Sequence, residues 1–83
     1  MFWVYVLRNA LTARLYTGYT SDLTQRLGQH NHGVTKSTKN RGIWELVHSE
    51  VFHSRSAAMR REKFLKSGKG REELKNLLAK NGP

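Results

Sequence analysis

The sequence predicts a small α+β domain, in which a three-stranded antiparallel sheet is flanked by helices in the order β-β-α-β-α-α. Three observations indicate this fold class. Short β-branched and aromatic runs separated by a turn open the chain, two segments with helical periodicity close it, and its 83 residues leave room for one core. A domain this small buries only about 60 to 65% of its extended surface, so a functional site must share its packing with that core.

The first two strands are expected to form a hairpin. Residues 2–7 (FWVYVL) are aromatic or β-branched on both alternations, which predicts a central strand covered on both faces and ended by Arg8. Residues 9–14 are turn-like, and residues 15–19 (LYTGY) predict the second strand. Gly18 within that strand indicates a bulge or a close backbone approach.

A helix is predicted over residues 21–32. Thr20 and Ser21 can cap it, Asp22 in its first turn suits the helix dipole, and Gly33 provides the stop.

An exposed basic loop and a third strand follow. Residues 34–42 (VTKSTKNRG) lack apolar periodicity and predict the loop, whereas residues 43–52 alternate well enough for a strand. The alternation puts Trp44 and Leu46 on one side of that strand, and Val47 and Val51 on the other.

Two helices complete the prediction. Ser54 or Ser56 caps the first, which runs to about Ser67, where Gly68 and Gly70 break it. A short helix over residues 71–80 places Leu74, Leu77 and Leu78 on one face. Because no repeat or linker divides the chain, we expect one domain over residues 1–83, with a core over 2–67 and a C-terminal helix over about 71–80.

The charge of the chain points to a polyanionic partner. Fifteen Lys and Arg against six Asp and Glu give a formal net charge of +9, which favours nucleic acid, although a charge that only solubilises the protein is the alternative. The longest apolar run is far shorter than the about 20 residues that span a bilayer, and no basic leader precedes it. We therefore expect a cytoplasmic protein without membrane association.

Metal chemistry is narrowed by the composition. The chain has no cysteine, which excludes disulfides and thiolate sites, and the spacing of its four histidines does not match a zinc site. Hard, oxygen-preferring cations remain open.

Polar residues interrupt the apolar faces of both long helices. Leu23, Leu27 and His30 share one sector of the first helix, and Arg26 lies at its edge, so that two polar groups face the sheet and can converge on one ligand. The alternative is an Arg26 that extends to water and a hydrogen-bonded core histidine. Glu62 lies similarly at the edge of the second helix, where a salt bridge to a neighbouring cation is the alternative.

Two tyrosines of the hairpin complete a set that can hold a phosphodiester. Tyr5 and Tyr16 are candidates for core aromatics with a hydroxyl at the rim. Together with the Arg, the His and the carboxylate on the following helices, they suggest a site that faces the sheet.

These residues resemble the GIY-YIG endonuclease domain. Its two tripeptides correspond to residues 3–5 (WVY) and 16–18 (YTG), its helical Arg and His match Arg26 and His30 in TQRLGQHNHG, and its metal-binding Glu matches Glu62 in AAMRREKFLK. The resemblance runs from about residue 2 to residue 67 and is especially close to the small stand-alone members of bacteria.

Three positions depart from the family pattern. Trp3 replaces the Gly of the first tripeptide, and Thr17 replaces the Ile of the second. Many active members have an Asn some dozen residues after the Glu, where this chain has Leu74, and Asn76 is the nearest candidate.

The resemblance implies a metal-dependent endonuclease that hydrolyses DNA phosphodiester bonds, structure-specific or weakly sequence-specific, in DNA repair or recombination. Glu62 would bind one divalent cation, Mg²⁺ or Mn²⁺, Arg26 would clamp the scissile phosphate, and Tyr5 would activate water with His30 or Tyr16. The main rival is a weakly catalytic or non-catalytic module of the same fold that binds DNA or RNA, favoured by the missing Asn. A ribosome-associated structural protein is a third class.

Basic side chains are expected to contact backbone phosphates, and a protein partner would supply any long-range specificity, since we recognise no appended DNA-reading module. The expected contacts are Arg14, Lys36, Lys39, Arg41, Arg60 and Arg61.

Overall fold

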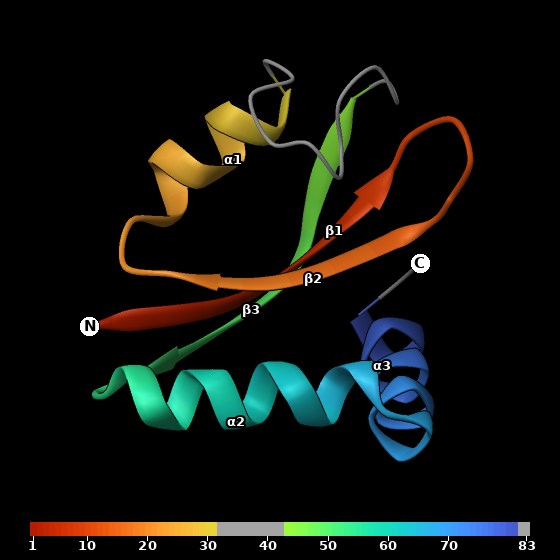
Figure 1. Ribbon diagram of the computed structural model, residues 1–83. Helices are drawn as coiled ribbons and strands as arrows, with labels where there is room; N and C mark the ends of the chain where they lie inside the picture. Colours follow the sequence, from red (N-terminus) through yellow and green to blue (C-terminus); the bar gives the residue numbers. More distant parts are fainter. Residues whose placement is uncertain (32–42, 82–83) are drawn as a thin grey trace.

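The computed structural model describes residues 1–31 and 43–81, and its elements follow the predicted order (Figure 1). They are β1 (Phe2–Asn9), β2 (Leu15–Thr20), α1 (Leu23–Asn31), β3 (Trp44–Phe52), α2 (Arg55–Lys66) and α3 (Gly68–Asn81).

The three strands form one antiparallel sheet in the order β2-β1-β3. Helix α1 covers one face, and α2 and α3 cover the other (Figure 1). Residues 4–7 at the centre of β1 are all buried, which confirms a central strand covered on both sides. The strand continues past Arg8 to Asn9, because Arg8 pairs with both neighbouring strands and Asn9 still pairs with Trp44 of β3.

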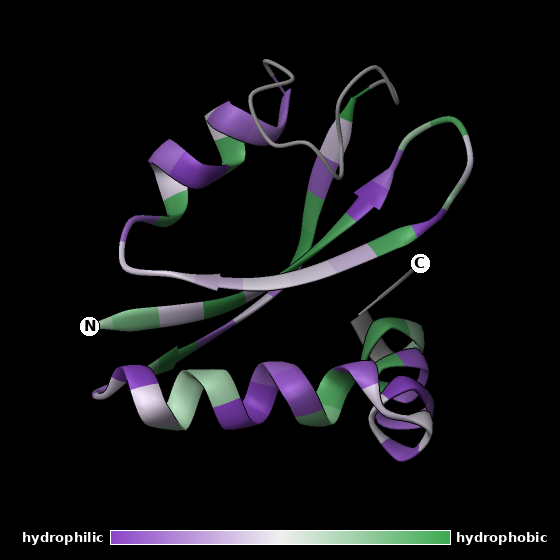
Figure 2. Cartoon of the chain, in the orientation of Figure 1, coloured by the Kyte–Doolittle hydropathy of each residue, from purple (hydrophilic) through white to green (hydrophobic). Residues whose placement is uncertain are grey.

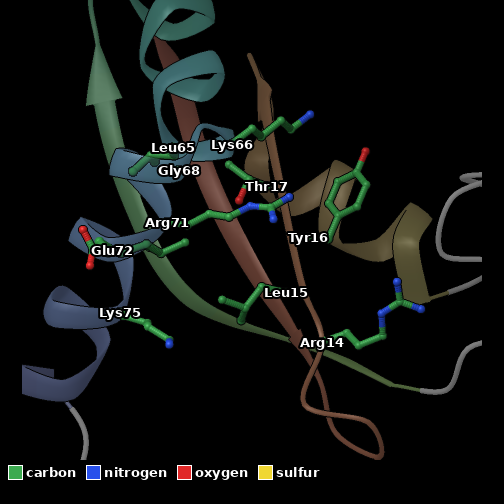
Figure 3. A pocket seen from close by; sticks show the side chains of 11 residues that line it. Arg14, Leu15, Tyr16, Thr17, Leu65, Lys66, Gly68, Arg71, Glu72 and Lys75 are labelled. Atoms are coloured by element: carbon green, nitrogen blue, oxygen red, sulfur yellow. The ribbon is translucent and has the colours of Figure 1, made fainter.

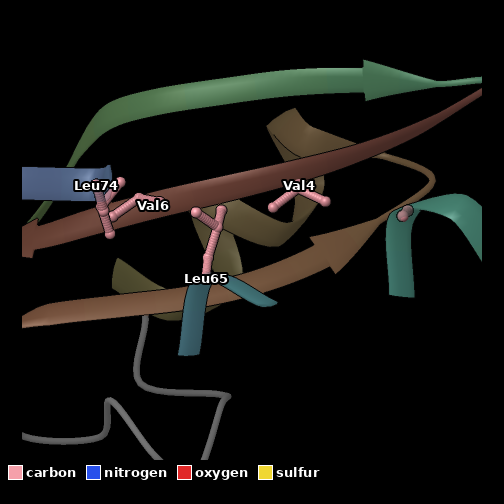
Figure 4. Close-up of a cluster of buried hydrophobic side chains, with 5 residues drawn as sticks. Val4, Val6, Leu65 and Leu74 are labelled. Atoms are coloured by element: carbon pink, nitrogen blue, oxygen red, sulfur yellow. The ribbon is translucent and has the colours of Figure 1, made fainter. Parts of the chain in front are cut away.

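Each face of the sheet has its own core. The aliphatic core, on the side of α2 and α3, consists of Val4, Val6, Ala58, Leu65 and Leu74 (Figure 4). The aromatic core, on the side of α1, consists of Tyr5, Leu7 and Trp44, with Tyr16, Leu23 and Leu27 packed against it. In Figure 2 the hydrophobic colour follows β1, while α1 and α2 carry much hydrophilic colour.

Asn9 organises the hairpin turn. Its side-chain Oδ1 accepts hydrogen bonds from the backbone N–H groups of Leu11 at 2.9 Å and Thr12 at 3.0 Å. The turn also holds Ala13 at a positive φ of 62°. The buried amide thus takes the place of backbone partners that the turn residues lack.

Helix α1 is shorter than predicted and is capped by a different residue. The N–H of Gln25 donates to Oδ1 of Asp22 at 3.0 Å, so Asp22 is the cap, whereas Thr20 Oγ1 accepts from the Asp22 N–H at 3.1 Å. The predicted stop at Gly33 and the predicted loop over 34–42 lie outside the described residues.

A bulge in β3 overturns the predicted alternation. In the register with β1, Val47 is skipped between the paired residues Leu46 and His48. A bulge shifts the alternation by one residue, so Val51 lies on the side of Leu46 and is 54% exposed. Val47 packs against the aliphatic core, whereas Val51 does not share that face.

The corner between α2 and α3 is tighter than predicted. Ser54 caps α2, because its Oγ accepts the N–H of Ala57 at 3.1 Å. Helix α3 begins at Gly68, so both glycines lie in its first turn and not in a break before residue 71. A Cβ at Gly70 would overlap the carbonyl oxygen of Phe64, and only glycine allows the two helices to approach this closely.

An ion-pair network ties α2 to its neighbours. Arg61 contacts Glu50 of β3 at 2.8 Å and Glu73 of α3 at 2.7 Å, and His48 contacts the same Glu50 at 2.7 Å. Across residues 1–31 and 43–81, every helix is too short or too polar to cross a membrane.

Candidate active site

A buried hydrogen bond joins the first strand to the first helix. The hydroxyl of Tyr5 lies 2.9 Å from Nε2 of His30, and the two residues are 2% and 1% exposed. His30 occupies the last turn of α1, on the face that Leu23 and Leu27 press against the aromatic core. The structure thus combines both readings of His30, as a hydrogen-bonded core histidine and as a member of a polar site.

Tyr16 packs beside this pair. Its ring centroid lies 4.7 Å from that of His30, edge to face, and 6.3 Å from that of Tyr5. Tyr5, Tyr16 and His30 are called the tyrosine–histidine cluster below. Two strands and a helix contribute to the cluster, so the fold and not the local sequence assembles it.

Gly18 makes room for the cluster. It pairs with Tyr5 in the sheet, and a Cβ at this position would lie 2.6 Å from the Tyr5 hydroxyl oxygen and 3.3 Å from a ring carbon of Tyr16. The sequence predicted a bulge or a close backbone approach at Gly18; the pairing with β1 is regular there, and the group that comes close is a tyrosine side chain.

Asn31 anchors the end of α1 next to the cluster. Its Oδ1 accepts the backbone N–H of Trp44 at 2.7 Å, and its Nδ2 donates to the carbonyl oxygen of the same residue at 3.2 Å. Neither Asn9 nor Asn31 was singled out from the sequence. The available signal was weak, since each is an asparagine at the end of an element, where side-chain amides often replace backbone partners.

Burial and charge set the protonation of the cluster. Burial raises the pKa of the Tyr5 hydroxyl above its ordinary range; Tyr16 and Glu62 add to the rise, and Arg26 opposes it. Burial also lowers the pKa of His30, and the nearby Arg26 charge lowers it further. At neutral pH, Tyr5 therefore keeps its proton and His30 is uncharged.

Within residues 1–31 and 43–81, Arg26 is a cation without an ion-pair partner. It is half-buried on α1, and its charge acts on both Tyr5 and His30. Among the described residues, no carboxylate forms an ion pair with it, unlike Arg61 in the network of α2. An uncompensated guanidinium beside polar aromatic groups suits an anionic ligand.

Glu62 reaches the site from the opposite face of the sheet. It lies on α2, its side chain is 18% exposed, and its Oε1 contacts Lys66 at 3.1 Å. The charge of Glu62 acts on Tyr5, although among the described residues no hydrogen bond joins Glu62 to the tyrosine–histidine cluster. The salt bridge expected as the alternative for Glu62 is thus present, at one oxygen of the carboxylate.

The hollow beside Glu62 is basic. It has a volume of about 460 Å³, and its lining includes Arg55, Arg60 and Lys63. The described residues contain no group of three or more His, Cys, Asp and Glu side chains that could hold a metal ion. A single carboxylate fits a cation such as Mg²⁺, which keeps several waters and completes its shell with substrate phosphate.

The other predicted phosphate contacts have different surroundings. Arg60 lines the hollow and Arg14 is exposed at the end of the hairpin, while Lys36, Lys39 and Arg41 lie outside the described residues. The guanidinium group of Arg61 already forms ion pairs with Glu50 and Glu73. We therefore leave Arg61 out of the proposed phosphate-binding set.

The region after α2 departs from the family pattern for a structural reason. Leu74, near the place of the family's Asn, is 3% exposed in the aliphatic core. Asn76 is exposed on α3.

Comparisons with known proteins identify the family of the chain. The model of the GIY-YIG catalytic domain matches residues 1–76. A UPF0213 protein of Natronomonas pharaonis is 48% identical over 66 residues, which cover 78% of this chain and 76% of the relative. A UPF0213 protein of Staphylococcus haemolyticus is 45% identical over 62 residues, 74% of this chain and 76% of the relative.

A solved structure extends the likeness to the fold. The solution NMR structure of a UPF0213 protein from Bacillus halodurans superimposes with a TM-score of 0.56 at 37% identity, covering 93% of this chain and 85% of the other. The family model spans every element from β1 into α3. The chain belongs to the GIY-YIG family.

Proposed function

We propose that the protein is a metal-dependent endonuclease that hydrolyses phosphodiester bonds of DNA, with a preference for shape over a long sequence. The observation that carries the proposal is the buried Tyr5–His30 hydrogen bond beside the uncompensated Arg26. Membership of a family of nuclease domains supports it. We expect the reaction to serve DNA repair or recombination in the cytoplasm.

Arg26 would bind the scissile phosphate. Its planar donor fork matches two phosphate oxygens, and its charge would stabilise the additional negative charge of the transition state. Removing one such donor from an enzyme typically lowers the rate by about 10² to 10³.

Tyr5 and His30 would act together as the base. Since the pKa of Tyr5 is raised, a free phenolate is scarce at neutral pH. We propose instead that the Tyr5 hydroxyl donates to Nε2 of neutral His30 and passes its proton there as its oxygen takes a proton from the attacking water. Tyr5 ends the step neutral and His30 ends it charged, and the lowered pKa of His30 helps it to release the proton afterwards.

Glu62 would hold one divalent cation, Mg²⁺ or Mn²⁺, which when bound neutralises charge on the phosphate and the leaving oxygen. The neighbouring cations of the hollow, including Arg60, would contact flanking phosphates.

The test is incubation with flapped, branched, single-stranded and duplex DNA and RNA in Mg²⁺ or Mn²⁺, with Glu62→Ala in parallel. We expect cleavage of DNA to fall at least about 10²-fold in Glu62→Ala. Glu45→Ala is the matched control, since that exposed carboxylate of β3 pairs only with the exposed Arg8 among the described residues. Cleavage that survives Glu62→Ala would refute the assignment.

One observation favours the rival reading as a nucleic-acid-binding module that cleaves poorly or not at all. The position near the family's Asn is used for core packing by Leu74, so one polar group of active relatives is missing there. Binding of DNA or RNA without cleavage of any substrate, in either metal, would establish this rival, with a protein partner then supplying specificity.

A further inference from the structure

A second hollow region runs along the free edge of the sheet. Strand β2 is an edge strand, and the groove between it and the corner of α2 and α3 has a volume of about 610 Å³ (Figure 3). Its lining includes Tyr16 and Thr17 of β2, Leu65 of α2, and Arg71 and Lys75 of α3.

The groove is positively charged. Lys66, Arg71, Lys75 and Arg14 line it against a single carboxylate, that of Glu72. In Figure 3 the side chain of Arg71 extends across the groove towards Thr17, whereas the carboxylate of Glu72 points away from the strand. Arg71 and Lys75 form no ion pair with the described residues, so their charges are available to a ligand.

Three leucines give the groove an apolar part. Leu15, Leu65 and Leu74 lie among the charged residues of the groove. An apolar floor under separated cations suits the sugars and bases of a strand whose phosphates contact the cations. The volume lies within the range of about 300 to 1,000 Å³ typical of small-ligand pockets, so it accommodates one or two nucleotides of one strand and not a duplex.

One residue links the groove to the candidate active site. Tyr16 belongs both to the tyrosine–histidine cluster and to the lining of the groove. A strand whose phosphate lies on Arg26 can therefore run past Tyr16 along β2 towards α3.

We propose that this groove binds a single-stranded segment of nucleic acid next to the scissile phosphate, with backbone phosphates on Arg71 and Lys75. Its position relative to the cut rests on the proposed function, whereas the binding itself does not. A substrate with a free strand, such as a flap, is accordingly the one that the protein would cleave best.

The first experiment uses the absence of cysteine from the chain. One variant carries Lys75→Cys and the other Lys69→Cys. Both also carry Glu62→Ala and are kept in EDTA, so that the oligonucleotide is not cleaved. Lys69 is an exposed lysine of the same helix that does not line the groove. A flap oligonucleotide with a short disulfide tether on its single strand should cross-link at position 75 at least about tenfold faster, as expected from local concentration. Equal rates at the two positions would overturn the proposal.

The second experiment measures affinity by fluorescence anisotropy, again in EDTA. Arg71→Ala with Lys75→Ala should weaken binding of a single strand about tenfold and reduce the slope of log K against log salt by about 1.4, or about 0.7 for each lost phosphate contact. Lys69→Ala is the control, and circular dichroism checks that each variant is folded. An equal loss of affinity in Lys69→Ala or an unchanged salt slope would contradict the proposal. So would a polyglutamate peptide whose binding requires Arg71 and which displaces the single strand at a lower concentration than unlabelled single strand does.

These outcomes are separate from those of the cleavage test. Groove-dependent binding without any cleavage would refute the nuclease and retain the groove. Cleavage that requires Glu62 but is indifferent to both groove cations would retain the nuclease and refute the groove.

Discussion

The two faces of the sheet are built from the same strand yet differ in what they bury. Towards α2 and α3, β1 contributes Val4 and Val6 to a core of aliphatic side chains. Towards α1 it contributes Tyr5, next to the buried His30. One face thus stabilises the fold through apolar burial, while the other accepts the cost of desolvating polar groups, which is typical of a functional site.

One arginine near each face shows a related difference. On the side of α2, Arg61 is matched by Glu50 and Glu73, so its charge is satisfied within the fold. On the side of α1, no described carboxylate pairs with Arg26. An unmatched cation beside a buried hydrogen bond therefore identifies the site better than charge density alone.

The largest effect is expected from Tyr5→Phe. The variant keeps the ring but loses the hydroxyl that contacts His30, so we expect the cleavage rate to fall by about 10² to 10⁴, as for a general base. The measurement is the cleavage rate on a flap substrate across a pH series, for Tyr5→Phe and for His30→Ala. If neither variant changes the rate by more than about tenfold, the assignment of the base is wrong.

Gly18→Ala is expected to damage the same face through geometry. The new Cβ would lie 2.6 Å from the Tyr5 hydroxyl, and displacing that group should reduce the rate about 10²-fold. Gly28→Ala is the matched control, because a Cβ there meets nothing within 4 Å. Because Gly28 lies in the middle of α1, Gly28→Ala should stabilise the protein by about 0.5 to 1 kcal/mol. Equal rates for the two variants would contradict the close approach at Gly18.

Val6→Ala should affect the opposite face only. Val6 is completely buried in the aliphatic core, and removing its two methyl groups should lower the free energy of unfolding by about 2 kcal/mol. Thermal unfolding should show a decrease in Tm of about 8 to 16 °C for a domain of this size. Below the new Tm, the cleavage rate of the folded protein should stay within about twofold of the unaltered chain, and a larger loss would show that the two faces are coupled.

The smallest effect is a difference in how the two faces respond to pH. The pKa of His30 is lowered by burial and by Arg26, so unfolded His30 binds a proton more readily than folded His30. Its stabilising contribution is complete above its unfolded pKa of about 6.5 and decreases as the pH falls through that value. On the other face, the hydrogen bond from Arg61 lowers the pKa of Glu50, whose contribution is present above about 4.3 and is lost below it.

Urea unfolding as a function of pH separates the two groups. His30→Gln should flatten the stability profile just below about pH 6.5, and Glu50→Gln should flatten it below about pH 4.3. A His30→Gln profile that is unchanged near pH 6 would contradict the buried, neutral histidine.

The candidate site was predictable in part. Arg26, His30 and Glu62 stood out because they interrupt apolar sectors of helices. The structure places His30 beside both tyrosines, and the charge of Arg26 acts on Tyr5 and His30. Glu62 lies across the sheet from that cluster and acts on Tyr5 through its charge. The groove beside α3 was not predicted, because its lining combines β2 with the corner of α2 and α3, which lies far from β2 in the chain.

Local pattern by itself determined the order of the elements, the central position of β1 and the end of α2 near Ser67. These features follow from side-chain periodicity and backbone freedom, which act over a few residues. Only the tertiary structure decided the bulge at Val47 and the partners of Arg61. Each depends on which neighbour satisfies a hydrogen bond or a charge, and that neighbour is set by packing and three-dimensional geometry.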